Sequence, residues 1–456
     1  MTLLIELSYL TAAALFIFGL KKMSRVATSR QGNLLAMAGM FLAVAATLFH
    51  QNIDYYGWIA LSVGVGAAVG ALMAVLVQMT AMPQMVALLN GFGGIASALV
   101  ASAEFLKSDG TPLSLIPISL GAFVGTLTFT GSMIAFGKLQ GWVAQRPVVY
   151  PSQNRINLLL CLGILLVGVL LVLSPSPFFY WLVFAGASIL GILLVLPIGG
   201  ADMPVVISLL NSYSGIAAAI TGFVLMNNIL IVAGALVGAA GLILTQIMCH
   251  AMNRSLANVA FGSFGKTSSA TAQKETSGYT HVKSATAEEA ALLLESPRSV
   301  IIVPGYGLAV SRAQHAVKKL AALLESRGAV VKYAIHPVAG RMPGHMNILL
   351  AEAEVPYNQL YEMDAINSEF AQTDVVLVIG ANDVVNPAAK DEPGSPIYGM
   401  PILNVAEAKS VIVLKRTLSP GFAGIKNPLF EKENTLLYYA DAKKGIEDLI
   451  SELEQL

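Results

Sequence analysis

The sequence is poor in charged residues and in cysteine. Charged side chains make up 12 % of the 456 residues and hydrophobic ones 55 %, a balance typical of membrane proteins. Positive and negative side chains are equal in number, at 27 each, and no basic cluster is present, which argues against nucleic-acid binding. Cys161 and Cys249 both lie in apolar segments, so they predict packed free thiols and neither a disulfide nor a metal site.

The few charged residues are distributed unevenly. Residues 1–255 contain fourteen of them and the last 201 residues contain forty. We therefore predict a transmembrane domain over 1–254, a linker over 255–285 and a water-soluble domain over 286–456. The first apolar segment has no basic residues before it and is followed by others, so it predicts a retained transmembrane helix and not a cleaved signal peptide.

Nine apolar segments approach the length of about 20 residues that a helix needs to cross a bilayer. They cover approximately 3–20, 32–50, 56–78, 83–106, 115–137, 156–174, 178–198, 203–225 and 229–251. Basic residues are concentrated in alternate loops, and the other loops contain only Lys107. The positive-inside rule then predicts that the N-terminus lies outside and the soluble domain in the cytoplasm, which agrees with an odd number of helices.

A two-helix unit occurs twice in the predicted membrane domain. Segment 82–90 resembles 203–211, Gly94-Ile95-Ala96 corresponds to Gly215-Ile216-Ala217, and 121–125 corresponds more weakly to 234–238. Each unit begins on the cytoplasmic side with a proline near the first helical position, where its missing N–H costs nothing. This pattern predicts two repeats in the same orientation, related by an axis along the membrane normal.

Polar residues inside these helices are few. Asn90 and Asn211 each lie about two turns inside the membrane, where an amide is costly unless it has a partner. Two interpretations remain open: helix-packing residues with one interhelical hydrogen bond each, or a hydrated proton path. The candidates for that path and its coupling are Asn90, Asn211, Ser132, Asp202, Gly234, Gly238, Gly241 and Arg254. No histidine or acid lies in the middle of a predicted helix, so this chain offers no obvious titrating proton carrier.

The last third of the sequence alternates strands and helices. A capping box, Thr286 to Glu289, opens a first short helix. Strands are predicted over 299–303, 329–336, 359–363, 374–380, 411–415 and 435–439, and helices up to about Ser326, over 345–353 and from Ala442. This βα alternation predicts an α/β doubly wound parallel sheet, a Rossmann-like domain that follows the all-α membrane bundle.

Three loops that follow predicted strands favour dinucleotide binding. Gly305–Val310 has the form GxGxx[A/V], where pyrophosphate can approach backbone N–H groups, although such a turn is also compatible with a purely structural role. Loop 337–344 offers more N–H groups and one guanidinium, and segment 380–383 ends a later strand. The candidate binding residues are Gly305, Tyr306, Gly307, Ala309, Val310, Val338, Ala339, Gly340, Arg341, Pro343, Gly380, Ala381, Asn382 and Asp383.

The choice between NAD and NADP depends on two sites. The second strand ends in Ile335-His336-Pro337, without the acid that usually binds the ribose 2′-hydroxyl of NAD. Lys415 and Arg416 end another strand, where two cations suit a 2′-phosphate, although they are also compatible with a solvated sheet edge. Together these features favour NADP.

Several long motifs resemble the β subunit of proton-translocating NAD(P) transhydrogenase. They are 199–204, 211–215, 304–307, 336–345 and 380–387, and the resemblance covers essentially the whole chain. It implies hydride transfer between NAD(H) and NADP(H), coupled to the movement of one proton. It also implies that a partner α subunit binds NAD(H), that this chain binds NADP(H) in an inverted orientation, and that two αβ units form a dimer in the bacterial inner membrane.

The resemblance also implies roles for particular residues. Lys415 and Arg416 would hold the 2′-phosphate, which matters because the inversion weakens the argument from the second strand. Gly421, Phe422 and Ala423 would cover the nucleotide, and Asp441 and Ala442 would border it. Asp383 would lie near the nicotinamide and link the proton state to NADP(H) affinity. Independently of the resemblance, Asp202 and Arg254 lie at the predicted cytoplasmic ends of the last two membrane helices, so they are candidates for transmission between the two domains, or simple helix-end anchors.

This sequence departs from the family pattern at two positions. Asn90 stands where some members have a histidine, so we predict that the titrating residue comes from the partner subunit, with Asn90 and Asn211 as polar neighbours. Phe422 stands where tyrosine is common. In the implied mechanism no side chain acts as acid or base in the hydride step, because positioning the two nicotinamides is the catalysis.

Two other function classes fit the membrane-plus-Rossmann layout. A channel or transporter with a nucleotide-sensing domain would carry a selectivity element, which we do not find in the sequence. A membrane oxidoreductase that reduces quinone would usually need flavin, haem or iron–sulfur ligands, and the two cysteines offer few.

Overall fold

The computed structural model describes residues 2–23, 28–50, 55–108, 110–253, 255–256, 279–421 and 423–456. The chain forms two compact units, Met1–Pro197 with Val206–Leu244, and Ile198–Val205 with Thr245–Leu456. Arg254, Phe422 and most of the predicted linker lie outside the described residues. The predicted domain limits stay a prediction.

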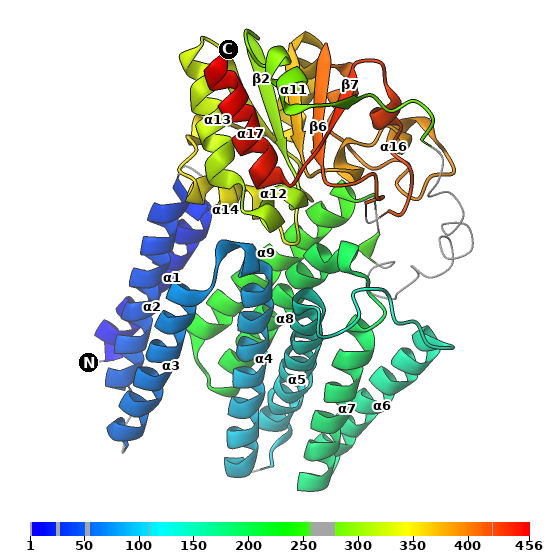
Figure 1. Cartoon of the computed structure of the whole chain (residues 1–456). Coiled ribbons are helices and arrows are strands. Elements are labelled where there is room, and N and C mark those ends of the chain that lie inside the picture. Colours follow the sequence, from blue (N-terminus) through cyan, green and yellow to red (C-terminus); the bar gives the residue numbers. More distant parts are fainter. Residues whose placement is uncertain are drawn as a thin grey trace. The chain divides into compact units, whose positions relative to one another are not determined.

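Nine of the described helices are long and apolar enough to cross a membrane, as the sequence predicts (Figure 1). They are α1 (Thr2–Met23), α2 (Ser29–His50), α3 (Tyr56–Leu76), α4 (Met82–Lys107), α5 (Pro112–Gln140), α6 (Gln153–Leu173), α7 (Pro177–Val195), α8 (Met203–Val224) and α9 (Asn228–Ala251). Their apolar length fits a multi-pass membrane protein.

The predicted repeat is visible in how these helices cross. A Cβ atom at Gly94 of α4 would lie 2.7 Å from the carbonyl oxygen of Gly125 on α5. The corresponding residues of the second repeat meet in the same way, because a Cβ atom at Gly215 of α8 would lie 2.4 Å from the amide nitrogen of Gly238 on α9. Equivalent positions of the two repeats therefore make equivalent backbone contacts, which only glycine permits.

The second unit contains a seven-stranded sheet in which every neighbouring pair is parallel. Its order is β1-β7-β6-β5-β2-β3-β4. The strands are β1 (Ser284–Ala285), β2 (Ser299–Pro304), β3 (Val330–Ile335), β4 (Leu360–Glu362), β5 (Val375–Ile379), β6 (Ser410–Lys415) and β7 (Thr435–Tyr439). This confirms the doubly wound fold class and each of the six predicted strands.

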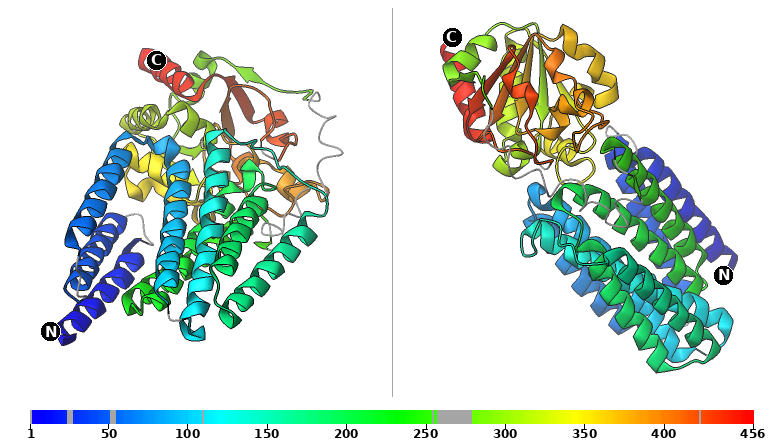
Figure 2. Two further views of the ribbon diagram at one scale, coloured as in Figure 1. Left: turned by 90° about the horizontal axis from the view of Figure 1, so that it is seen from below. Right: turned by 90° about the vertical axis from the view of Figure 1, so that its right-hand side faces the viewer.

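Helices cover both faces of the sheet (Figure 2). Val300 and Ile302 of β2 belong to one core, with the helices α11 (Ala287–Leu293), α12 (Tyr306–Ser311), α13 (Gln314–Ser326), α14 (His345–Glu352) and α17 (Ala442–Gln455). Ile301 and Val303 belong to a second core, with α15 (Met363–Ile366) and short 3₁₀ turns. Both faces are buried, which explains why the central strands are continuous apolar runs.

Two local features differ in how well they follow from sequence. The capping box is confirmed: Thr286 Oγ1 accepts the Glu289 N–H at 3.2 Å, and Glu289 accepts the Thr286 N–H at 2.9 Å. The helix expected to continue to Ser326 is instead divided into α12 and α13, because Arg312 adopts a left-handed conformation with φ 52°.

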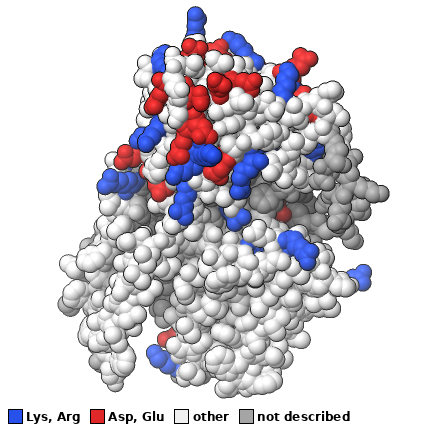
Figure 3. Space-filling model, in the orientation of Figure 1, with Lys and Arg blue, Asp and Glu red and all other residues white. Residues whose placement is uncertain are grey.

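The charged residues follow the division that the sequence predicts. In Figure 3 the face shown has most of its Lys, Arg, Asp and Glu side chains over the sheet and its covering helices. The long apolar helices show few charges on the same face. A surface without charge suits contact with lipid, and a charged one suits water.

Candidate functional site

The strand order changes direction between β2 and β5. From β2 the chain continues through β3 to β4 on one side, and from β5 it continues through β6 to β7 on the other. The loops after β2 and β5 therefore leave the sheet side by side and in opposite directions, at the point where open α/β sheets bind ligands. The Gly305 N–H donates to Ile379 O at 2.8 Å, and the Gly307 N–H to Gly380 O at 3.0 Å.

Glycine is required where these two loops meet. A Cβ atom at Gly305 would lie 2.4 Å from the Cα of Ala381. Gly380 has φ +64°, and a Cβ atom there would lie 2.3 Å from the Cα of Gly307. The contact leaves bare backbone at the carboxyl edge of the sheet, which lets a phosphate group approach closely.

A cleft at this edge brings together residues from five loops. Of the residues predicted from sequence, its lining includes Gly305, Tyr306, Gly307, Val338, Ala339, Gly340, Gly380, Ala381, Asn382, Asp383, Lys415, Arg416, Gly421, Ala423 and Ala442. It also includes residues that the sequence analysis missed, namely Ser311, Val384, Pro396, Ile397, Met400, Leu414, Thr417, Ser419, Pro420 and Ala440. Thr417, Ser419 and Pro420 follow Lys415-Arg416 directly, so their position in the chain was the available signal.

Other predicted residues lie outside the lining of the cleft. Ala309 is buried in the core and Val310 is exposed. The Arg341 guanidinium stacks on the Tyr306 ring at 4.4 Å from its centroid, and Pro343 lies farther along the same loop. Asp441 caps α17 by accepting the Lys443 N–H at 3.1 Å, so its position has a structural explanation.

Asp383 and Lys415 are two charged residues of the cleft lining, and both are half-buried. Asp383 Oδ2 accepts the Ala423 N–H at 3.0 Å, which connects Ala423 to the loop after β5. Lys415 Nζ donates to Ser419 O at 3.0 Å and lies 4.6 Å from the centroid of the Phe430 ring. Burial lowers the pKa of Lys415 to about 8, and the negative charge of Asp383 partly opposes that shift.

Most of the predicted polar residues in or next to the membrane helices are buried. Asn90 is 7 % exposed and donates from Nδ2 to Ile207 O of α8 at 3.4 Å, one turn before Asn211. Ser132 is fully buried, and its hydroxyl has no hydrogen-bond partner among the described residues. Asn211 is half-buried, and Asp202 is buried just before α8 begins. Arg254 cannot be placed, since it is outside the described ranges.

The remaining predicted residues are the glycines of α9, and these contact α8. Cβ atoms at Gly234 and Gly241 would lie 2.3 Å from Ala219 N and 2.8 Å from Ser212 N, respectively. Ser212 Oγ donates to Gly238 O at 2.7 Å. The described part of the chain contains no group of three His, Cys, Asp or Glu residues that could hold a metal ion.

Comparison with known proteins agrees with this arrangement. The family model described as "NAD(P) transhydrogenase beta subunit" matches residues 5–452. Two proteins named "NAD(P) transhydrogenase subunit beta", both from Rhodospirillum rubrum, are each 49 % identical to this chain over 452 residues, which is 97 % of either protein's length and 97 % of this chain. The chain therefore belongs to the NAD(P) transhydrogenase beta-subunit family.

Proposed function

We propose that this chain binds NADP(H) and works with an α subunit that binds NAD(H), so that a hydride passes between the two cofactors while a proton crosses the membrane. The observation that carries the proposal is the bare backbone contact of Gly305–Gly307 with Gly380–Ala381, with Lys415 and Arg416 at the same edge. Backbone at a switch point suits a pyrophosphate, and two cations suit the additional phosphate of NADP.

The residues of the cleft would bind and orient the cofactor. When bound, NADP(H) supplies the hydride donor or acceptor. The loops that begin at Gly305 and Val338 would contact the nucleotide through the backbone, and Lys415 with Arg416 would hold the 2′-phosphate. Positioning is then the main catalytic contribution of this chain, because hydride transfer between two aligned nicotinamides needs no acid or base.

The membrane part of the proposal concerns the bacterial inner membrane, with the N-terminus outside, the sheet domain in the cytoplasm and two αβ units in the complex. Asn90 and Ser132 support a polar path, since both are buried inside α4 and α5, and an unpartnered buried hydroxyl favours a water molecule as its partner. The titrating group of this path would come from the α subunit.

Reconstitution of the complex with its α subunit into liposomes tests the function. We expect hydride transfer from NADPH to an NAD⁺ analogue to change the internal pH. Asn90→Ala should lower the rate of proton movement about fivefold or more, because typical coupling energies correspond to factors of that size or larger. Hydride transfer that is not coupled to proton movement should remain. Asn33→Ala, at an exposed position of α2, is the matched control. Hydride transfer without proton movement in the wild type would contradict the proposal, and normal pumping by Asn90→Ala would contradict the role of Asn90.

Asp383 is the proposed link between proton state and the cover of the nucleotide. Asp383→Asn keeps an acceptor for the Ala423 N–H but loses the charge. We expect this variant to bind NADP⁺ within about tenfold of the wild type and to lose proton-coupled turnover about 5- to 150-fold, the span of typical coupling energies. The same liposome assay measures this loss. Asp391→Asn, at an exposed position, should behave as the wild type, and a coupled Asp383→Asn enzyme would refute the role.

A further inference from the structure

Two buried histidines lie at the ends of the loop between β3 and α14. His336 follows β3 and His345 is the first residue of α14, and each is only 1 % exposed. The loop between them contributes Val338, Ala339 and Gly340 to the cleft. Neither imidazole lines the cleft itself, so each lies behind the residues that do.

Each imidazole accepts a backbone N–H of this loop through Nδ1. The Val338 N–H donates to His336 Nδ1 at 3.2 Å, and the Arg341 N–H donates to His345 Nδ1 at 3.1 Å. A backbone N–H can only donate, so both Nδ1 atoms must be unprotonated and the remaining proton is on Nε2. His336 Nε2 then donates to Pro401 O at 2.8 Å, which fixes that ring to a second segment.

The turn at Gly340, between the hydrogen-bonded N–H groups of Val338 and Arg341, is tightly packed against His345. Gly340 has φ +107°, and a Cβ atom there would lie 2.5 Å from His345 Nδ1, so the loop backbone lies directly on the ring. The next residue, Arg341, places its guanidinium over the Tyr306 ring of the neighbouring loop. A displacement of the imidazole would therefore reach both loops at this edge of the cleft.

We propose that His336 and His345 are positioning residues for NADP(H), neutral imidazoles that hold the Val338 and Arg341 N–H groups and thereby shape the cleft-facing backbone of Val338–Gly340. This inference rests on the proposed binding of NADP(H). Burial favours the neutral imidazoles, because it lowers the pKa of both to about 4. At His336 the hydrogen bond to Pro401 and the charge of Asp364 raise the pKa, but less than burial lowers it. The neighbouring charge of Arg341 lowers the pKa of His345 further.

The two histidines allow variants that separate the individual bonds. His345→Asn retains an acceptor near the position of Nδ1 and loses only Nε2, which has no partner among the described residues. His345→Leu removes the acceptor and leaves the Arg341 N–H unsatisfied. At His336, Asn retains an acceptor for the Val338 N–H but loses the donor to Pro401 O. Gln does the reverse: its longer side chain can donate to Pro401 O, but it places no acceptor near the position of Nδ1.

The experiment measures NADP⁺ binding and steady-state kinetics of the full-length chain in complex with its α subunit. Leaving a buried N–H unsatisfied has a cost equivalent to about a five- to hundredfold change in an equilibrium constant. We expect this cost to appear in NADP⁺ binding, because the loop must leave its cleft-facing position for the N–H to find another partner. We expect that loss, seen as a higher KM for NADP(H) with nearly unchanged kcat, for His345→Leu and His336→Gln. His345→Asn and His336→Asn should stay within about threefold of the wild type. Equal losses in the Asn and Leu variants, or normal binding by His345→Leu, would overturn the inference.

A second measurement uses the wild-type complex and so does not depend on whether a variant folds. In ¹⁵N spectra of the histidine-labelled chain at pH 6, the signals of His336 and His345 should show an unprotonated Nδ1 and a protonated Nε2. A protonated Nδ1 at either residue would overturn the assignment. Failure of the wild type to bind NADP⁺ would refute the proposed function and this inference with it, whereas normal wild-type binding with the wrong variant pattern would refute this inference alone.

Discussion

Replacing Lys415 and Arg416 together by alanine is expected to weaken NADP⁺ binding by about 10²- to 10⁴-fold and to leave the weaker binding of NAD⁺ nearly unchanged. Each hydrogen bond to a charged group contributes about 1.5–3 kcal/mol, so two lost contacts give a loss of this size. NAD⁺ has no 2′-phosphate and so loses nothing at this site. Calorimetry on the purified full-length chain with both nucleotides measures the difference.

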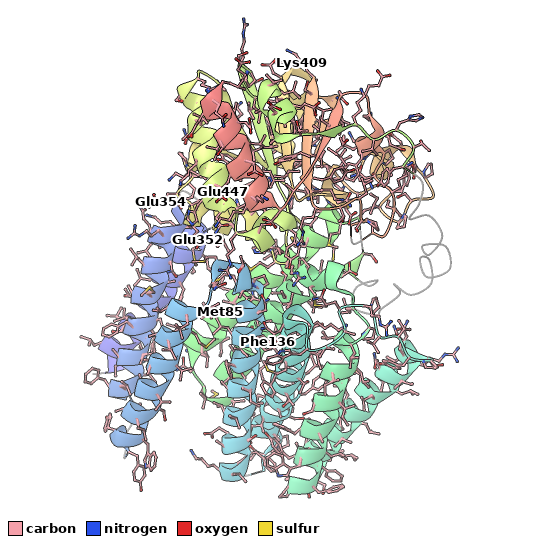
Figure 4. The ribbon with its side chains drawn as sticks, in the orientation of Figure 1. Met85, Phe136, Glu352, Glu354, Lys409 and Glu447 are labelled. Carbon is pink, nitrogen blue, oxygen red and sulfur yellow. The ribbon has the colours of Figure 1, made fainter. Side chains whose placement is uncertain are left out.

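A suitable control replaces a lysine at the other end of the same strand, because Lys415 is at the carboxyl end of β6. Lys409, just before β6, pairs with Asp374 at 2.7 Å and is distant from the cleft along the strands (Figure 4). Lys409→Ala should bind NADP⁺ as the wild type does. If the double variant lost affinity for NAD⁺ as strongly as for NADP⁺, these cations would not bind the 2′-phosphate specifically, and the proposed preference for NADP would be wrong.

The same lysine gives the binding a characteristic pH dependence. With its pKa near 8 before binding, Lys415 is mostly charged at pH 7 and mostly neutral at pH 9. A bound phosphate favours the charged form, so binding above pH 8 requires uptake of a proton, and affinity should fall up to about tenfold per pH unit as the pH rises. Lys415→Arg should remove this dependence, because a guanidinium stays charged.

Much of the sheet follows from local sequence, and the exceptions have physical causes. β2, β5 and β6 are apolar on both faces, so their sequences are recognisable without knowledge of their neighbours. β1 has two residues, and its pairing with β7 depends on contacts between distant parts of the chain. The division at Arg312 has no glycine or proline beside it, so the sequence contains no signal for it.

The candidate site could be predicted to a similar extent. Loops that follow parallel strands meet at one edge, so the motifs at Gly305, Val338, Gly380 and Lys415 could be grouped from sequence. The contributions of Ser311 and Ile397 to the cleft could not, since they depend on how a helix and a distant loop pack. The hydrogen bonds of His336 and His345 could not be predicted either, because a sequence motif specifies residue types but not which ring nitrogen accepts a hydrogen bond.

Gly234→Ala is expected to destabilise the membrane helices by about 3 kcal/mol or more and to abolish coupled activity, whereas Gly121→Ala is expected to be tolerated. The two glycines are equivalent in the repeat, but a Cβ atom at Gly234 would lie 2.3 Å from Ala219 N, and one at Gly121 no closer than 3.4 Å to the Ala101 side chain. A methyl group forced against backbone can be accommodated only by moving a helix, which costs more than ordinary overpacking of side chains.

Thermal unfolding of the two variants in detergent, followed by the liposome assay, measures this contrast. Gly121→Ala should unfold at or slightly above the wild-type temperature, because alanine favours a helix by about 1 kcal/mol relative to glycine. Equal tolerance at Gly234 would mean that α8 and α9 can separate without loss of function, and the close crossing would then be a consequence of packing alone. A selective loss at Gly234 would mean that this position of the second repeat tolerates a methyl group less well than its equivalent in the first, so the two halves of a symmetric sequence pattern contribute unequally at this level of the coupled membrane unit.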